Sequence, residues 1–159
     1  VLASHMSTIK VNPAHRILEI GAGMGVAGLC CARMGHAITI TEYNEDALNF
    51  ARANALLNNI ESDIVVKLDW NQPLVQGKFD YIIGSEVVFK ETDFPGLYFL
   101  FQKYLKPGGR IILAEGMRKT SLKFIQEMEK HFQIRMKKHT IGPEEKSVSV
   151  VLMEMREKK

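Results

Sequence analysis

Short apolar runs and helix-patterned segments alternate along the chain. A run of about five apolar residues bounded by turn signals is typical of a buried parallel strand. Such runs predict strands over residues 16–20, 37–41, 64–68, 79–83 and 110–114. Apolar residues at the spacing of an amphipathic helix predict helices over residues 1–10, 26–34, 45–58, 94–105 and 121–131. This repeated alternation predicts a mostly parallel sheet with helices on both faces.

The last part of the chain departs from the alternation. Two further strands are predicted over residues 133–141 and 147–155, and the turn between them, residues 142–145, is too short for a helical crossover. Strands joined in this way pair as an antiparallel hairpin. The predicted fold is therefore an α/β three-layer sandwich built on a Rossmann-like, mostly parallel sheet of seven strands. No linker or low-complexity tract divides residues 1–159, which predicts one domain.

The first ten residues, VLASHMSTIK, place apolar side chains on one face of a short helix, which Asn12-Pro13 then ends. The start is abrupt. Ser4-His5-Met6 matches the remnant of a tag, but the apolar spacing around it is that of a native helix. We therefore expect residues 1–13 to be an N-terminal helix whose upstream segment is missing.

Composition narrows the class of protein. Apolar residues make up 46% of the chain and charged residues 25%, which is ordinary for a soluble globular protein. No apolar run reaches the roughly 20 residues that a membrane span needs. The two cysteines, Cys30 and Cys31, are neighbours in a predicted helix and are poorly placed to pair, and no metal-ligand spacing is present. These observations predict a cytoplasmic protein without a metal.

The net charge of +3 is distributed unevenly. The first 100 residues carry 7 Lys or Arg and 11 Asp or Glu, whereas the last 59 carry 14 and 7. A basic C-terminal part is compatible with nucleic acid or an acidic partner. Without aromatic residues interleaved among the cations, solvated helix and strand faces are the better interpretation, and we do not expect a nucleic-acid partner.

The stretch RILEIGAGMG, residues 16–25, carries the strongest functional signal. A predicted strand containing one acid, Glu19, runs into Gly21, Gly23 and Gly25, and a helix follows at once. Glycines let the backbone turn sharply, and the exposed N–H groups at a helix start suit a polar or anionic ligand group. We therefore expect a ligand to lie directly on this loop.

The ends of the next three strands supply more polar groups. The second strand ends at Glu42, the third at Asp69-Trp70 and the fourth at Ser85-Glu86. Ligands of open parallel sheets bind at the carboxyl ends of strands, where Glu42 is placed to accept both hydroxyls of a ribose and Asp69 an adenine amino group. Glu42 also has a structural interpretation as a solvated strand end, and Asp69 as a turn or helix cap. For Tyr43 and Trp70 the alternative is core packing, and for Glu19 it is a structural bond to backbone N–H groups.

The glycine spacing argues against a dinucleotide site. A dinucleotide fingerprint has its third glycine or alanine three residues after the second. Here that position is Val26, and the third glycine is Gly25. The chain also has no room for a separate dehydrogenase substrate domain. An oxidoreductase is therefore the weakest of the candidate functions.

The motifs RILEIGAGMG, TITEYN, VVKLDWNQP, FDYIIGSEVVF and LKPGGRIILAEG, in this order, resemble those of class I, seven-strand methyltransferases, over nearly the whole chain. LDW, FDYIIGSEVVF and the opening VLA resemble in particular methyltransferase family 16, the methyltransferase-like group of protein lysine methyltransferases. The resemblance implies S-adenosylmethionine as the cofactor and S-adenosylhomocysteine as its product. It also implies an antiparallel last strand, inserted between the fifth and sixth.

The resemblance assigns parts of the cofactor to particular residues. The amino-acid end would be held by Glu19, Gly21, Gly23 and Gly25, the ribose by Glu42, and the adenine by Tyr43, Asp69 and Trp70. Ala22 in the glycine loop and Ser85 at the fourth strand end complete the expected cofactor site.

The sequence departs from the family at the acceptor position. Lysine methyltransferases of this group carry Asp-x-x-Tyr after the fourth strand, whereas this chain has Glu86-Val87-Val88-Phe89. The acid gains a methylene and the phenol is lost. We expect Glu86 to orient an amine or accept its proton, with Phe89 as a pocket wall. The structural alternative for Glu86 is an exposed acid at a helix N-terminus.

The sequence supports two candidate functions. The leading hypothesis is a methyltransferase that uses S-adenosylmethionine to methylate a protein side chain, lysine-like, or a small-molecule amine. The alternative is a non-catalytic module with the same fold that serves as a partner subunit, which the lost tyrosine favours. The sequence does not indicate an oligomeric state.

Overall fold

Seven strands form one sheet in the computed structural model, which describes residues 1–143 and 147–158. The strands are β1 (Arg16–Ile20), β2 (Ala37–Glu42), β3 (Val65–Lys67), β4 (Phe79–Ser85), β5 (Leu105–Gly116), β6 (Phe132–Ile141) and β7 (Val148–Glu157). The helices are α1 (Leu2–Met6), α2 (Val26–Arg33), α3 (Glu45–Leu57), α4 (Phe94–Tyr104) and α5 (Lys119–Met128), with short 3-10 turns η1 (Ser62–Ile64) and η2 (Glu91–Asp93).

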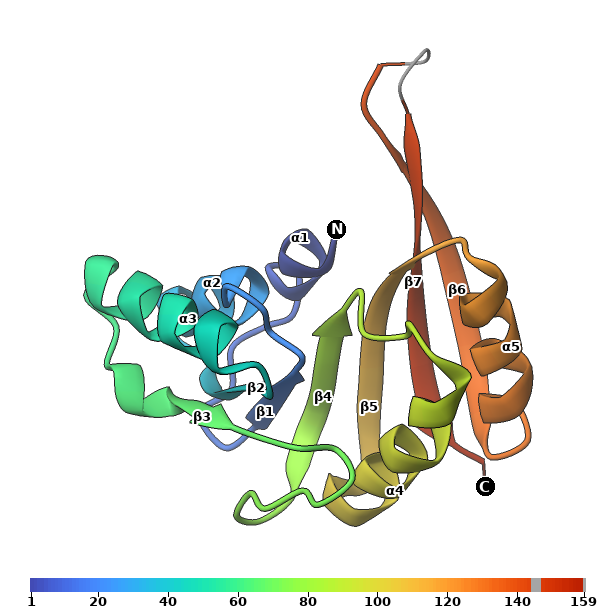
Figure 1. The fold of residues 1–159 in the computed structure, drawn as a ribbon, viewed down its shortest axis with the longest axis horizontal. Coiled ribbons are helices and arrows are strands. Elements are labelled where there is room, and N and C mark those ends of the chain that lie inside the picture. Colours follow the sequence, from blue (N-terminus) through green and yellow to red (C-terminus); the bar gives the residue numbers. More distant parts are fainter. Residues whose placement is uncertain (144–146, 159) are drawn as a thin grey trace.

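The strand order is β3-β2-β1-β4-β5-β7-β6 (Figure 1). Neighbours from β3 to β5 are parallel, and β7 is antiparallel to both β5 and β6. The predicted α/β class, the mostly parallel sheet and the antiparallel strand inserted between the fifth and sixth are therefore confirmed. Half of the predicted turn at residues 142–145, namely residues 144 and 145, lies outside the described residues.

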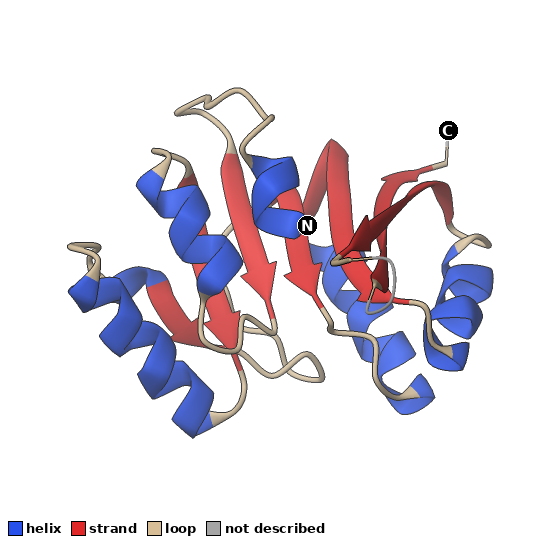
Figure 2. Cartoon of the chain, turned by 90° about the horizontal axis from the view of Figure 1, so that it is seen from above, coloured by secondary structure: helices blue, strands red, loops and turns tan. Residues whose placement is uncertain are grey.

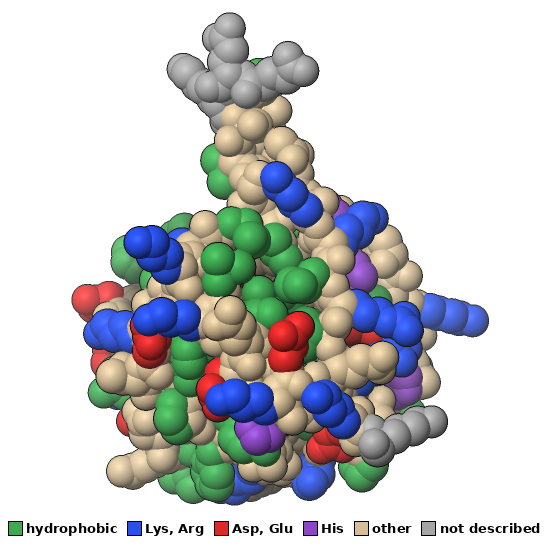
Figure 3. Space-filling model, turned by 90° about the vertical axis from the view of Figure 1, so that its right-hand side faces the viewer, with side chains coloured by type: hydrophobic (Ala, Val, Ile, Leu, Met, Phe, Trp, Pro, Cys, Tyr) green, Lys and Arg blue, Asp and Glu red, His purple; other side chains and the backbone are tan. Residues whose placement is uncertain are grey.

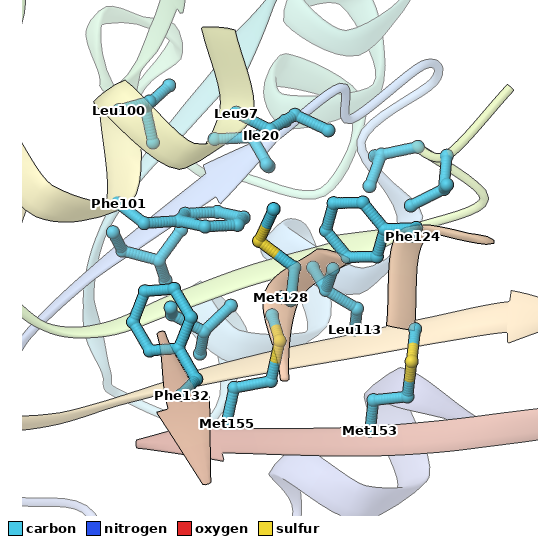
Figure 4. Packing of buried hydrophobic residues seen from close by; sticks show 14 of the residues in the cluster. Ile20, Leu97, Leu100, Phe101, Leu113, Phe124, Met128, Phe132, Met153 and Met155 are labelled. Atoms are coloured by element: carbon cyan, nitrogen blue, oxygen red, sulfur yellow. The ribbon is translucent and has the colours of Figure 1, made fainter. Parts of the chain in front are cut away.

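Helices cover both faces of the sheet (Figure 2). Side chains of the strands alternate between two hydrophobic cores, one on each face. In β5, Ile111 and Leu113 pack with α4 and α5, whereas Ile112 and Ala114 pack on the face that α1, α2 and α3 cover. The first core is rich in aromatic and methionine side chains, among them Phe101, Phe124, Phe132, Met128, Met153 and Met155 (Figure 4). Because strands with apolar side chains on both faces need cover on both, the three-layer arrangement follows from the sequence pattern.

Several element boundaries differ from the prediction, most of all the end of α1 and the start of β5. Helix α1 ends at Met6 rather than near residue 10, because the Ser7 and Thr8 hydroxyls donate to the Ser4 and His5 carbonyls and compete with helical bonding. Strand β3 is three residues long, since residues 62–64 form η1.

Strand β5 begins at Leu105, five residues before the predicted start. Leu105 pairs with Phe79, and a shift of register separates this pair from the regular ladder that begins at Arg110. The Lys106-Pro107-Gly108-Gly109 segment ends helix α4, as predicted, but it continues along the edge of β4 as an irregular strand.

The glycine loop lies where the connections of the sheet change direction. Strand β1 pairs with β2 on one side and with β4 on the other. The chain therefore builds the sheet outward from β1 in one direction through β2 and β3, and then in the other direction from β4 onward. A crevice at the carboxyl ends of the strands is the usual ligand position of such a sheet. Helix α1 lies near this end of the sheet (Figure 1), and its first residues line the cavity described below.

Candidate cofactor and acceptor site

The glycine loop folds as a sharp turn from β1 into α2. Gly21, Gly23 and Gly25 all have left-handed φ angles, of 57°, 56° and 79°, which explains why glycine stands at each position. The Ala22 N–H donates to the Thr41 carbonyl at 2.9 Å, so the loop is tied to β2. Gly25 is the N-cap of α2.

Glu42 fastens the glycine loop to the segment that follows β2. One of its carboxylate oxygens accepts a hydrogen bond from the Gly23 N–H, and the other accepts from the Tyr43 and Asn44 N–H groups, each at 2.8 Å. A carboxylate offers about four lone-pair directions, so these three bonds leave acceptor capacity for a ligand hydroxyl. The structural and ligand-binding interpretations of Glu42 are therefore compatible.

Glu19 is buried at the wall of the same loop, with 2% of its surface exposed. Burial raises the pKa of its carboxyl from 4.5 to about 8; the nearby Gly28 N–H opposes this in part, and Glu42 adds to it. Its Oε2 has no hydrogen-bond partner among the described residues. A Cβ at Gly28 would lie 2.1 Å from this oxygen, so the glycine is what makes room for the acid. A buried acid lacking a partner fits the ammonium group of a ligand.

Two adjoining hollows meet at the glycine loop, with volumes of about 510 and 440 Å³. The first lies against α1 and the start of α2, and among the expected residues it is lined by Glu19, Gly21, Ala22, Gly23, Glu42, Ser85, Glu86 and Phe89. The second lies toward β3 and is lined by Gly21, Glu42, Tyr43, Asp69, Trp70, Glu86 and Phe89. The structure therefore brings together every expected residue except Gly25, which faces Ala51 and Leu29 behind the loop.

The second hollow has an aromatic and acidic wall. The Trp70 ring lines this hollow close to the glycine loop, since a Cβ on Gly21 would lie 3.2 Å from it. The indole also packs against the hydrophobic core. Asp69 accepts from the Asn71 N–H and side-chain amide through one oxygen, at 2.9 and 3.1 Å. Tyr43 is 61% exposed at the rim. An apolar ring floor with acceptors at its edge fits an adenine.

The loop after β4, where the sequence predicts the acceptor position, forms one side of the cavity. Glu86 adopts a left-handed φ of 54°, and its side chain turns toward the end of β5. Its Oε1 accepts from the Gly116 N–H at 2.6 Å, and its Oε2 pairs with the Arg118 guanidinium at 2.5 Å. Phe89 is 57% exposed and lines both hollows.

Two charged residues beside this loop were not predicted. Glu115 is 1% exposed and accepts from the Val87 and Val88 N–H groups, at 2.8 and 3.3 Å, while its other oxygen pairs with Arg118. Burial raises the pKa of Glu115 to about 7, and the Glu86 charge contributes to the rise. The sequence signal was the AEGMR segment at the end of the fifth strand, where two charged residues follow a buried run.

Other expectations bear on the surroundings of the site. Cys31 is buried, which raises the pKa of its thiol to about 12, and Cys30 is exposed. Within residues 1–143 and 147–158, no cluster of three or more acidic, His or Cys side chains is arranged to hold a metal. None of the described helices is long and apolar enough to cross a bilayer. On the side of β6 and α5, cationic side chains are spread among acidic and apolar ones (Figure 3).

The sheet order, the reversed seventh strand and the glycine loop at the switch point define a class I methyltransferase fold. Precorrin-6y C5,15-methyltransferase of Geobacter metallireducens has a similar structure, with a TM-score of 0.78 at 16% identity, over 99% of this chain and 88% of that one. The ribosomal protein L11 methylase of Lactobacillus delbrueckii subsp. bulgaricus gives a TM-score of 0.75 at 22% identity, over 99% and 77%.

Sequence comparison identifies the family. The model of the lysine methyltransferase family matches residues 3–139, and the chain belongs to this family. The family resemblance drawn from the motifs is therefore confirmed.

Curated relatives differ in the residue that their names say they methylate. Protein N-lysine methyltransferase METTL21A of Danio rerio is 30% identical over 145 residues, which are 85% of this chain and 66% of that protein. The histidine protein methyltransferase 1 homolog of Dictyostelium discoideum is 33% identical over 105 residues, 62% and 34% of the two chains. The chain thus spans about a third to two thirds of the length of these relatives.

Proposed function

We propose that the protein is a methyltransferase that transfers a methyl group from S-adenosylmethionine to a side chain of a protein substrate. The observation that carries this proposal is the composition of the larger hollow. Glu19, Glu42 and Glu86 line it, and no Lys, Arg or His side chain of the described residues does. S-adenosylmethionine carries an ammonium and a sulfonium group, so a wall that carries acids and no cationic side chain favours its binding.

Different residues around the hollows would bind different parts of the cofactor. Glu19 would receive the ammonium group, and the glycine loop would let the amino-acid end lie against the backbone. Glu42 would accept the ribose hydroxyls, with Asp69, Trp70 and Tyr43 around the adenine. When bound, S-adenosylmethionine supplies a methyl group that is already activated by the sulfonium charge. The chain itself has to align the acceptor, exclude water and manage one proton.

Glu86 and Phe89 would form the acceptor wall. With one oxygen of Glu86 bonded to the Gly116 N–H and the other to Arg118, its carboxylate is better placed to orient an acceptor than to take its proton. The family match and the relatives named as lysine and histidine protein methyltransferases support a protein acceptor and favour an enzyme over a non-catalytic module. Because Glu86 and Phe89 replace the Asp and Tyr of the family's lysine motif, the proposal specifies a protein side chain as the acceptor and leaves its residue type to the peptide panel below. The cytoplasmic location remains a prediction.

Binding and turnover test the proposal in two stages. Calorimetry with S-adenosylhomocysteine, S-adenosylmethionine and NAD should give binding of the first two and none of the third. Labelled S-adenosylmethionine should then transfer methyl groups to a panel of peptides with lysine, histidine or arginine acceptors. Absence of S-adenosylhomocysteine binding would refute the proposal, and binding without transfer to any acceptor would favour the non-catalytic module.

A further inference from the structure

A guanidinium joins the ends of two neighbouring strands behind the acceptor wall. The Arg118 Nη2 lies 2.5 Å from Glu86 Oε2 and 3.0 Å from Glu115 Oε2, and the guanidinium carbon lies 4.6 Å from the centre of the Phe89 ring. One cation thus touches both residues expected at the acceptor position. Arg118 itself lines neither hollow.

The loop that Arg118 contacts is held at several further points. The Gly116 N–H donates to Glu86 Oε1, and the Glu86 N–H donates to the Ala114 carbonyl at 2.8 Å. The left-handed backbone at Glu86 is one that a residue with a side chain keeps only when its surroundings enforce it. The bonds to the end of β5 are what enforce it here.

The buried Glu115 carboxylate requires a cationic partner, and Arg118 supplies it. This carboxylate is buried beneath the loop, where Oε1 holds the Val87 and Val88 N–H groups. A buried carboxylate is stable in its charged form only when it is paired. Arg118 is the cation that faces it in the described structure, through Oε2. Arg118 and Glu115 together therefore clamp residues 86–89 to the end of β5.

The position of Arg118 breaks a local rule for helices. Arg118 is the N-cap of α5, where Ser, Thr, Asp or Asn normally accepts a hydrogen bond from the first turn, and its side chain makes no cap bond. A cation at this end also opposes the helix dipole. The residue is thus unfavourable for its own helix, and its side chain instead pairs with Glu86 in the loop after β4 and with Glu115 near the end of β5. Such departures from local preference are expected at functional sites.

We propose that Arg118 is a positioning residue that holds Glu86 and Phe89 in place for the methyl acceptor. The inference rests on the proposed function, because it assigns the loop after β4 to the acceptor side of that site. It adds a residue that does not touch the cofactor or the acceptor. The cofactor side, where Glu42 holds the Gly23 N–H, shares no bond with Arg118.

Amide hydrogen exchange tests the clamp without knowledge of the acceptor. Three variants are compared with the unmodified chain: Arg118→Ala, Arg118→Lys and, as a matched control, Arg156→Ala, whose side chain is similarly exposed and pairs with Glu154 on β7. In Arg118→Ala the Val87, Val88 and Gly116 amides should exchange at least roughly tenfold faster, which is the effect of losing one charge-assisted bond. Arg118→Lys should retain part of the protection, since lysine cannot span both carboxylates and stack on the ring.

Affinity and turnover provide the functional readout. The affinity of Arg118→Ala for S-adenosylhomocysteine should stay within about threefold of the unmodified chain, as expected for independent sites. With a peptide acceptor from the panel above, its kcat or acceptor KM should worsen by at least about tenfold. Millimolar guanidinium should recover part of that loss.

The outcomes separate the two proposals. Unchanged exchange at the three amides, or the same change in Arg156→Ala, would overturn the clamp. Faster exchange over the whole chain would also overturn it, because that result indicates a purely structural role. Failure of the unmodified chain to bind S-adenosylhomocysteine would refute the proposed function, and the exchange comparison would still decide whether Arg118 holds the loop.

Discussion

The Glu19 carboxylate lies directly against the backbone of Gly28, and a side chain at residue 28 would exclude it. The carboxylate fills the position that any side chain at residue 28 would occupy. In a helix, glycine is less favourable than alanine by about 1 kcal/mol, so its presence in α2 needs a reason. The reason is the acid on the neighbouring strand, and the pair forms one feature of the proposed cofactor site.

Replacing Gly28 with alanine should therefore weaken cofactor binding. The new Cβ would also lie 2.6 Å from Ile40 Cγ1, so Glu19 has to move out of its place or β2 has to shift. We expect the affinity for S-adenosylhomocysteine to fall by more than about tenfold despite the better helix propensity of alanine. Gly96→Ala in α4 is the control, because its Cβ would lie 3.1 Å from the Asn71 Oδ1 and at an ordinary contact distance of 3.6 Å from the Trp70 carbonyl oxygen. Equal affinities in the two variants would contradict the prediction.

The raised pKa of Glu19 makes stability depend on pH. The carboxyl titrates near 4.5 when unfolded and near 8 when folded, so between these values the folded chain binds more protons than the unfolded chain. Stability of the cofactor-free protein should therefore be complete below about pH 4.5 with respect to this group and decrease as the pH rises toward 8.

A comparison of thermal unfolding at pH 5.5 and pH 8 checks this sign. Glu19→Gln should lose less stability between the two values than the unmodified chain, and each kcal/mol of difference corresponds to roughly 2–4 °C in Tm for a chain of this size. Glu115, with its pKa near 7, adds a slope of the same sign that the variant keeps. The prediction fails if the two slopes coincide.

Sequence reasoning found the acids at the strand ends but not their pairing. Glu42 was expected from its place after a strand, whereas its bonds to three backbone N–H groups follow from how two loops fold against each other. The contact between Glu86 and Arg118 joins residues far apart in the sequence. It depends on the register of β4 and β5, in which Ser85 lies beside Ala114, and no local pattern encodes that register.

At the scale of elements, the site is a set of strand ends tied together by single side chains. Glu42 at the end of β2 holds the loop after β1, as Glu115 at the end of β5 holds the loop after β4. Element types were predictable because periodicity and glycine turns are local signals. The early start of β5 was not, because a Lys-Pro-Gly-Gly segment gives a turn signal whether or not a neighbouring strand edge is available.

Glu42→Gln tests the tie between β1 and β2. Glutamine keeps the size of the side chain, but only one of its terminal atoms accepts hydrogen bonds, so either the Gly23 bond or the two bonds to residues 43 and 44 must be lost. We expect a loss of stability of about 1–3 kcal/mol and weaker S-adenosylhomocysteine binding. Chemical denaturation and calorimetry measure the two effects. Glu45→Gln, which removes an exposed ion pair with Lys67, is the control and should leave both nearly unchanged.

At the scale of the molecule, the crevice lies between groups of elements that belong to different cores. Trp70 and Val87, beside the second hollow, pack with α4 and α5, whereas Ala22 and Ala27, beside the first, pack with α2 and α3. A ligand that fills both hollows therefore contacts residues from both faces of the sheet. The fold class was predictable at this scale because strand and helix alternation restricts the topology.

S-adenosylhomocysteine should accordingly stabilise the whole chain in one unfolding transition. A ligand present at about 100 times its Kd adds roughly 2.7 kcal/mol, which corresponds to a rise in Tm of about 5–10 °C. NAD at the same concentration should give no rise, since the glycine spacing does not suit a dinucleotide. Scanning calorimetry measures both. A shift with NAD equal to that with S-adenosylhomocysteine would contradict the assignment.

The position of the antiparallel strand β7 between β5 and β6 means that the sheet cannot be completed until β7 has been synthesised. Strands β1 to β4, whose ends carry most of the proposed cofactor residues, precede residue 86 in the chain. Strand β6 has no bond to β5 and joins the sheet only through β7, which follows it in the chain. While a ribosome is still making β7, the exposed edge of β5 is open to pairing with other chains. The nascent protein thus carries its glycine loop before all seven strands of its sheet are in place.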